Sequence, residues 1–118
     1  MKKFFKKVAA FFVTAYANRI YKQAVTAAEL RYDEEKDMIF VITDPSEPSR
    51  LMVMNLKQFL DLRHRFRIPS KELTIQTLKN RCWYHTKSKL GREALTEEDK
   101  TVRRLAFVRE ALRRAKVA

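Results

Sequence analysis

The sequence predicts a small α+β domain, and three observations lead to that fold class. Apolar residues recur every three or four positions over about residues 3–31, the spacing of one face of a long helix. Two runs rich in β-branched residues, 39–43 and 51–54, flank a proline-bearing turn and predict a β-hairpin. Capping residues then precede further apolar-periodic stretches. We therefore expect a long N-terminal helix, one β-hairpin, two short helices and a C-terminal helix.

Length and composition indicate a single domain over residues 1–118. One glycine and three prolines leave no stretch that resembles a flexible linker. Cys82 is the one cysteine, so no disulfide can form within the chain. This fits a reducing compartment, and we expect a cytoplasmic protein.

The N-terminal stretch has two interpretations. A lysine-rich start, an apolar run from Val8 and small residues at Ala15 and Ala17 resemble a secretory signal. The helical apolar pattern, however, continues past position 17, which a cleaved signal has no reason to do, so we disfavour secretion. The expected inner line of the helix is Phe5, Ala9, Phe12, Tyr16, Ile20 and Ala24.

The same stretch has the chemistry of a membrane-surface helix. It places Lys2, Lys3, Lys6 and Lys7 beside Phe4, Phe5, Phe11 and Phe12. The simpler interpretation is that the phenylalanines cover the hairpin while the lysines stay in water. A membrane surface is therefore not the expected partner.

The hairpin is apolar on both faces. Ile39 and Val41 point one way along the first strand, and Phe40 and Ile42 point the other way. A strand of this kind needs cover on both faces, from helices, from a second subunit or from another protein. Its open edges are also sites where a further strand can dock. In the turn, Asp44 is expected to hydrogen-bond its own backbone.

Two short helices are expected after the hairpin. Asn55 suits the N-cap of the first, which should end by Ile68 because Pro69 disfavours helical geometry before it. Ser70 suits the cap of the second. Its expected inner line is Ile75, Leu78 and Cys82. A helix-turn-helix would present Lys71, Thr74, Thr77 and Asn80 to base edges. The turn lacks glycine, and ordinary helix packing explains the pattern as well.

Residues 81–92 interleave aromatic and basic side chains, as surfaces that bind nucleic acid do. Trp83 and Tyr84 either stack on bases or close the core at the end of a helix. Gly91 is the position expected to take a positive φ. The pair Cys82 and His85 indicates neither a zinc site nor a nucleophile, because too few ligands and no orienting group accompany it. We predict no catalytic residue, metal or cofactor, and hence no enzyme.

The last helix is expected to begin after Thr96, with three acids in its first turn. Its expected inner stripe is Leu105, Val108, Leu112 and Ala115, flanked by Val102 and Phe107. Arg109, Arg113 and Lys116 recur at spacings of four and three residues. Such a basic line either tracks phosphates or is a solvated face.

Charge is the strongest global feature of the sequence. The formal net charge is +12, and residues 1–28 contain six bases and no acid. A surface of this kind attracts nucleic acid or another polyanionic surface. The leading hypothesis is a non-enzymatic protein that binds nucleic acid mainly through phosphates. The predicted nucleic-acid-binding residues are Arg81, Trp83, Tyr84, Lys87, Lys89, Arg92, Arg109, Arg113 and Lys116.

Two segments, YANRIYKQAVTAAE at 16–29 and CWYHTKSKLGREALTEEDKTVRRLAFVREAL at 82–112, carry a resemblance. They look like a group of small, basic, uncharacterised proteins of Bacteroides-type gut bacteria and their tailed phages. The resemblance implies no active site, but it suggests a phage protein. The alternative hypothesis is therefore a structural component of a larger assembly, such as a virion or head–tail protein. That hypothesis predicts a homo-oligomer or a protein partner through the hairpin edge, and location in the virion.

Overall fold

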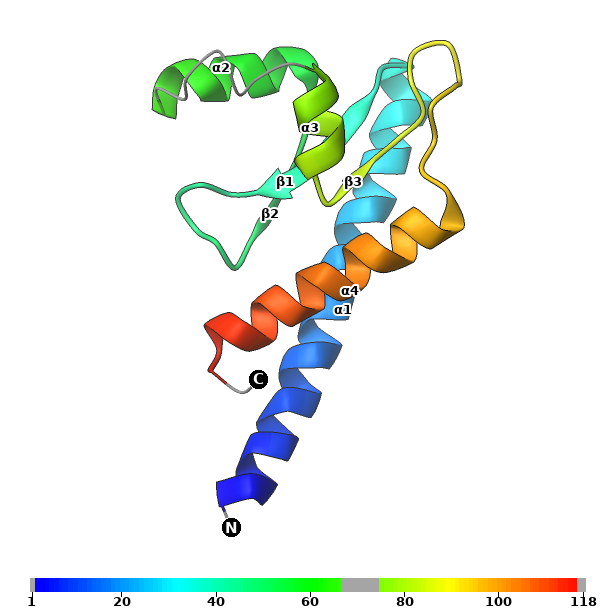
Figure 1. Cartoon of the computed structure of the whole chain (residues 1–118). Coiled ribbons are helices and arrows are strands. Elements are labelled where there is room, and N and C mark those ends of the chain that lie inside the picture. The colour runs from blue at the N-terminus through cyan, green and yellow to red at the C-terminus, as the bar shows by residue number, and fades with distance from the viewer. Residues whose placement is uncertain (1, 67–74, 117–118) are drawn as a thin grey trace.

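The computed structural model describes residues 2–66 and 75–116, and it confirms the predicted α+β class (Figure 1). Two helices, α1 and α4, pack on one face of a small sheet, and α2 and α3 lie on the other face. The elements in chain order are α1 (Lys2–Glu35), β1 (Ile39–Thr43), β2 (Leu51–Asn55), α2 (Leu56–Phe66), α3 (Ile75–Arg81), β3 (Tyr84–His85) and α4 (Glu97–Arg114).

The sheet has three antiparallel strands in the order β2-β1-β3. The predicted hairpin is confirmed, with Val41 opposite Val53 in the β1–β2 register. The third strand was not predicted, because Trp83 and Tyr84 were placed at the end of a helix. Strand β3 is only two residues long, and backbone bonds from Trp83 N to Val41 O (2.9 Å) and from Thr86 N to Ile39 O (3.0 Å) extend its pairing.

Both faces of the hairpin are covered by helices of the same chain. Ile39 and Val41 pack in the core formed by α1 and α4, whereas Phe40 and Met54 pack against α2 and α3. Strand β2 lies at the edge of the sheet, and Arg31 of α1 donates a hydrogen bond to Val53 O there (3.0 Å). The expected need for cover on both faces is thus met within the chain.

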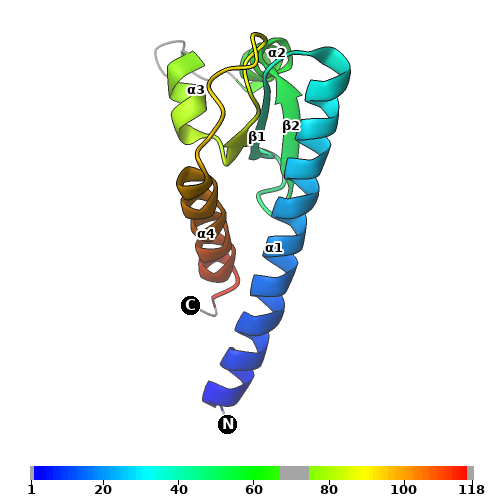
Figure 2. The same ribbon diagram turned by 90° about the vertical axis from the view of Figure 1, so that its right-hand side faces the viewer.

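Helix α1 is longer than predicted and buries a different line of residues. The side chains that enter the core are Ala17, Tyr21, Ala24 and Ala28. Of the predicted inner line, Ala24 is buried and Ile20 packs against the core, but Phe5, Phe12 and Tyr16 are exposed, so the prediction is wrong for the N-terminal half of α1. Small alanines let the sheet approach α1 closely, and Figures 1 and 2 show the N-terminal half of α1 extending beyond the sheet. The phenylalanines therefore do not cover the hairpin.

The turn between β1 and β2 is organised by Asp44, as predicted. Its carboxylate accepts hydrogen bonds from the backbone N–H of Ser46 (2.9 Å) and from the Ser46 hydroxyl (2.7 Å). These hydrogen bonds hold the pKa of Asp44 below its ordinary value. The Asx-type turn directs Pro48 and Ser49 towards α1 and α4, where they help to line a groove.

Helix α2 begins with a capping box that confirms Asn55 as its N-cap. Gln58 N donates to the Asn55 side chain (2.8 Å), and Asn55 N donates back to Gln58 (3.1 Å). Leu78 and Cys82 of the predicted inner line after α2 are buried, but Ile75 is exposed. The predicted boundary at Ile68 and Pro69, the Ser70 cap, and Lys71 and Thr74 of the helix-turn-helix lie outside the described residues.

Helix α4 is capped by Thr96, whose hydroxyl accepts a hydrogen bond from Asp99 N (3.1 Å), as predicted. Phe107 and Val108 are its buried residues. Val102 and Leu105 were expected to lie inside but are exposed, because the helix packs on α1 through the side that carries Phe107. The predicted buried stripe of α4 is therefore rotated about the helix axis relative to the observed one.

Candidate functional site

The predicted binding residues form two groups at opposite ends of α4. The first group, here called the post-β3 loop, consists of Lys87, Lys89 and Arg92. The second, the α4 basic line, consists of Arg109, Arg113 and Lys116. Arg109 lies about 18 Å along the axis from the first turn of α4, at a rise of about 1.5 Å per residue. The groups are therefore separate, and a ligand that contacts both must be extended.

The post-β3 loop is tied to the end of α1. Backbone bonds from Ser88 N to Arg92 O (2.6 Å) and from Gly91 N to Ser88 O (2.8 Å) close a tight turn. Gly91 has the predicted positive φ, +75°. The Tyr32 hydroxyl donates to Ser88 O (3.2 Å), which holds the loop beside the acid-rich stretch 33–37. The three bases are exposed.

The aromatic residues of this segment are part of the core. Tyr84 is only 5% exposed, and its hydroxyl donates to the Glu29 carboxylate. Burial raises the pKa of Tyr84. The prediction that Tyr84 stacks on bases is wrong, because strand β3 directs its ring into the core. Trp83 is half-buried, donates from Nε1 to Thr43 (2.8 Å) and meets Phe107 edge-on, with ring centroids 5.4 Å apart. Arg81 is exposed at the end of α3.

The α4 basic line is exposed along its whole length. Arg113 forms an ion pair with Glu110, and hydrogen bonding to Arg113 lowers the pKa of that carboxyl. Arg109 and Lys116 have no carboxylate partner among the described residues. They are thus the members of the line whose charges are available to an outside anion.

Several other bases have a structural role that the sequence analysis did not assign. Arg103 donates to Lys79 O (2.9 Å) and to Cys82 O (2.6 Å), which joins α4 to the end of α3. Arg104 donates to the Asn18 side chain of α1 (2.9 Å). Helical spacing in the sequence could have indicated the structural role of Arg103. This residue lies four positions before Phe107 and hence on the same side of the helix.

Cys82 and His85 are buried and not prepared for nucleophilic chemistry. Burial raises the pKa of the Cys82 thiol, and burial lowers the pKa of the His85 imidazole, so both groups are held neutral. Strand β3 places His85 between the sheet and the α2–α3 layer, with Nδ1 2.9 Å from Thr86 O. In the part of the chain that the structure describes, no three His, Cys, Asp or Glu side chains gather as metal ligands.

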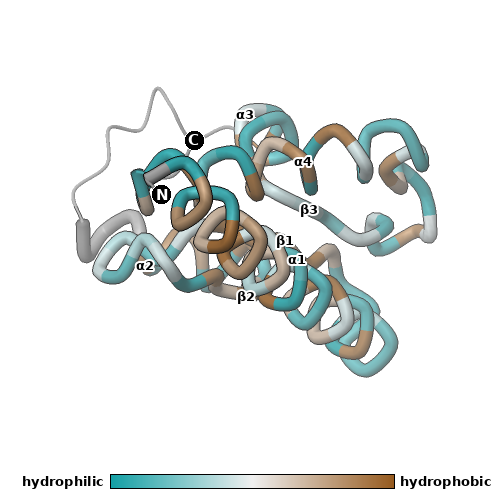
Figure 3. Tube along the Cα trace, turned by 90° about the horizontal axis from the view of Figure 1, so that it is seen from below, coloured by the Kyte–Doolittle hydropathy of each residue, from teal (hydrophilic) through white to brown (hydrophobic). Residues whose placement is uncertain are grey.

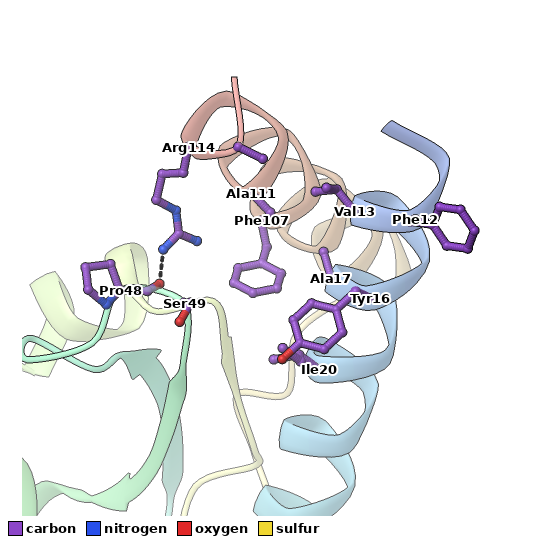
Figure 4. A pocket seen from close by; sticks show the side chains of 11 residues that line it. Phe12, Val13, Tyr16, Ala17, Ile20, Pro48, Ser49, Phe107, Ala111 and Arg114 are labelled. Carbon is purple, nitrogen blue, oxygen red and sulfur yellow. Dashed lines mark hydrogen bonds between the residues drawn. The ribbon is translucent and has the colours of Figure 1, made fainter. Parts of the chain in front are cut away.

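An open apolar groove of about 870 Å³ lies between α1, α4 and the hairpin turn (Figure 4). Tyr16, Ala17 and Phe107 point towards one another across it, whereas the Phe12 ring points away from it. Arg114 spans one side, where its guanidinium donates to Pro48 O. The groove has no signal in the sequence, because its walls come from three segments far apart in the chain.

Comparison of the chain with protein-family models, with curated proteins and with solved structures found no match. A separate examination of the described helices finds none that is both long and apolar enough to span a membrane.

Proposed function

We propose that this chain is a non-enzymatic binding protein whose basic surface engages nucleic acid mainly through phosphates. The observation that carries the proposal is the exposed α4 basic line, in which Arg109 and Lys116 have no carboxylate partner among the described residues. Unpaired, exposed guanidinium and ammonium groups release bound counterions from a polyanion when they replace them. The post-β3 loop supplies further bases at the other end of α4.

The residue types in these groups favour backbone contacts over sequence reading. Arg and Lys neutralise phosphates, whereas base discrimination needs side chains that enter a groove as a set. Tyr84 is buried and Trp83 uses its N–H within the chain, so neither adds an aromatic platform for bases. We expect similar affinity for duplexes of different sequence.

The test is fluorescence anisotropy of the full chain with a labelled short DNA duplex at several salt concentrations. Five bases, Lys87, Lys89, Arg92, Arg109 and Lys116, predict a slope of log affinity against log salt of about −4.5. The affinity should therefore fall about 500-fold between about 50 and 200 mM salt. Absence of binding at low salt, or affinity independent of salt, would overturn the proposal.

A pair of matched variants tests the location. The double variant R109Q/K116Q should reduce the slope to about −2.7, because two phosphate contacts are lost. The control K22Q/K57Q removes the same charge from two exposed lysines on α1 and α2 and should leave the slope unchanged. Equal losses in both variants would mean that net charge alone governs binding and that α4 is not the site.

The alternative, a structural component of an assembly, was suggested by the resemblance and by a hairpin with two apolar faces and open edges, and of these the need for outside cover of the faces is gone. The two apolar faces of the hairpin are already covered by α1 and α4 and by α2 and α3. The outer edge of β2 remains, and Arg31 bonds to one of its carbonyls, that of Val53. A defined oligomer in sedimentation, indifferent to DNA, is the result that would favour this alternative.

A further inference from the structure

The N-terminal half of α1 carries a row of large apolar side chains that no described element covers. This aromatic face consists of Phe4, Phe5, Val8, Phe11, Phe12 and Tyr16. Its five aromatic rings are 63–71% exposed and Val8 is 37% exposed. The rings contact mainly their neighbours, as Phe4 meets Phe5 and Phe11 meets Phe12 edge-on. Four phenylalanines exposed to this degree present roughly 500 Å² of apolar surface, large for the surface of a monomer.

Apart from Tyr16, whose ring points into the groove between α1 and α4, the aromatic face points away from the body of the molecule. At about 100° per residue, its six side chains occupy an arc of about 140°. The buried residues of α1, from Ala17 to Ala28, are centred about 180° away on the same helix. Helix α1 therefore has two apolar faces in opposite directions, and only one of them packs against the protein. Figure 3, which views the chain from below, shows apolar and polar stretches alternating along the α1 coil.

Basic residues accompany the aromatic face. Lys3, Lys6 and Lys7 lie on the opposite side of the same turns and are exposed. Residues 2–28 contain no Asp or Glu. The C-terminal end of α4, with Arg113 and Lys116, points to the same end of the molecule (Figures 1 and 2). This end of the protein is therefore both apolar and strongly cationic.

We propose that residues 2–16 bind the surface of an anionic lipid bilayer, with the aromatic face inserted at the level of the headgroups and upper acyl chains. A helix with an apolar face and a lysine-rich polar face binds such an interface in its plane. Long lysine side chains can bend back from the polar side of the helix to reach the headgroups. Because the core lies on the opposite side of α1, the helix can lie flat with the body of the protein in water.

The charge argues for a bilayer over a second copy of the chain. Pairing two aromatic faces would bring Arg19 and Lys22, which lie on the same side of α1, towards the partner helix, where residues 1–28 offer no acid to compensate for them. Beyond Tyr16, the same side of α1 continues with Arg19, Lys22 and Gln23, which suit headgroups and not acyl chains. The inserted segment therefore ends at Tyr16. This proposal rests on residues 2–16 of α1, which the nucleic-acid proposal does not use, although Arg113 and Lys116 contribute charge to both.

The first experiment is co-sedimentation of the full chain with vesicles of phosphatidylcholine alone or mixed with phosphatidylserine. We expect binding to the anionic vesicles, weakened about 30-fold or more in F4Q/F11Q, because two inserted rings are lost. Replacing Lys3, Lys6 and Lys7 by Gln should weaken binding about fivefold per lysine. The matched control V102Q/L105Q removes two exposed apolar residues of α4 and should bind as the parent chain does.

The second experiment separates insertion from adsorption by charge. An environment-sensitive fluorophore is attached to Val8→Cys at the centre of the aromatic face, or to Lys6→Cys on the opposite side. The native Cys82 is buried. We expect a blue shift on anionic vesicles at position 8 and none at position 6. Each of four results would overturn the proposal. They are equal shifts at positions 8 and 6, vesicle binding that F4Q/F11Q does not change, no vesicle binding at all, and a dimer that F4Q/F11Q dissociates.

Discussion

Arg103 is predicted to be the basic residue on which the stability of the fold depends most. One nitrogen of its guanidinium donates to Lys79 O at 2.9 Å and to Cys82 O at 2.6 Å. These carbonyls end α3 and lead into β3, so one side chain of α4 joins three elements. In Arg103→Met, the apolar stem is retained and both carbonyls lose a charged donor.

The magnitude follows from the two hydrogen bonds. A hydrogen bond to a charged group contributes about 1.5–3 kcal/mol, and Arg103 is half-buried, so we expect a loss of about 3 kcal/mol. In urea unfolding followed by far-UV circular dichroism, this loss should lower the midpoint by about 1–2 M, at about 2 kcal/mol per molar urea. The slope of the transition should not change, because the same surface is exposed on unfolding.

The matched control is Arg109→Met on the same helix, whose side chain is exposed and has no carboxylate partner among the described residues. Its free energy of unfolding should stay within about 0.5 kcal/mol of the parent value. Equal urea midpoints for the two variants would refute this prediction, since the burial and hydrogen bonds of Arg103 would then contribute nothing to the free energy of unfolding.

Three further predictions concern local contacts. Tyr84→Phe should cost about 1–2 kcal/mol, measured by urea unfolding, because the Glu29 carboxylate loses its donor. Thr96→Ala should cost about 1 kcal/mol through loss of the α4 N-cap, seen in the same assay. Burial holds the pKa of His85 below its ordinary value of 6.5, so as pH falls below about 6.5 the unfolded chain takes up a proton that the folded chain does not. Stability should therefore fall as the pH is lowered through about 6.5, and His85→Gln should flatten that dependence.

Each of these predictions has an outcome that contradicts it. Tyr16→Phe, at an exposed ring, is the control for Tyr84→Phe, and an equal loss in both would remove the role given to Glu29. An unchanged melting temperature in Thr96→Ala would mean that the first turn of α4 does not need its cap. A His85→Gln variant as sensitive to pH as the parent would place the titrating group elsewhere.

Local chemistry made the fold class, the hairpin and the helix caps predictable. Asn55 and Thr96 cap helices through bonds between residues three apart, so their signals are complete within a few positions of the sequence. Gly91 was predictable for the same reason. Strand β3 was not, because its two residues acquire their extended structure from β1, more than forty positions earlier.

The inner faces of the long helices were harder to predict than the helices themselves. In α1, phenylalanines and alanines both recur at helical spacing, and hydrophobicity alone favours the larger side chains. The sheet instead packs on Ala17, Ala24 and Ala28, where the backbone can approach closely. The residue types of the exposed basic groups could be predicted from the sequence. Which arginines are exposed depends on the rotation of α4 about its axis, and packing alone sets that rotation.

The position of Phe107 and Val108 in the core has a consequence for the order of events during synthesis. Tyr21 and the buried alanines of α1 reach their final packing only when α4, the last helix of the chain, has been made. At about 5–20 residues per second, residues 2–16 precede α4 by several seconds. The aromatic, lysine-rich segment is therefore outside the ribosome and able to meet a surface before the rest of the chain has folded.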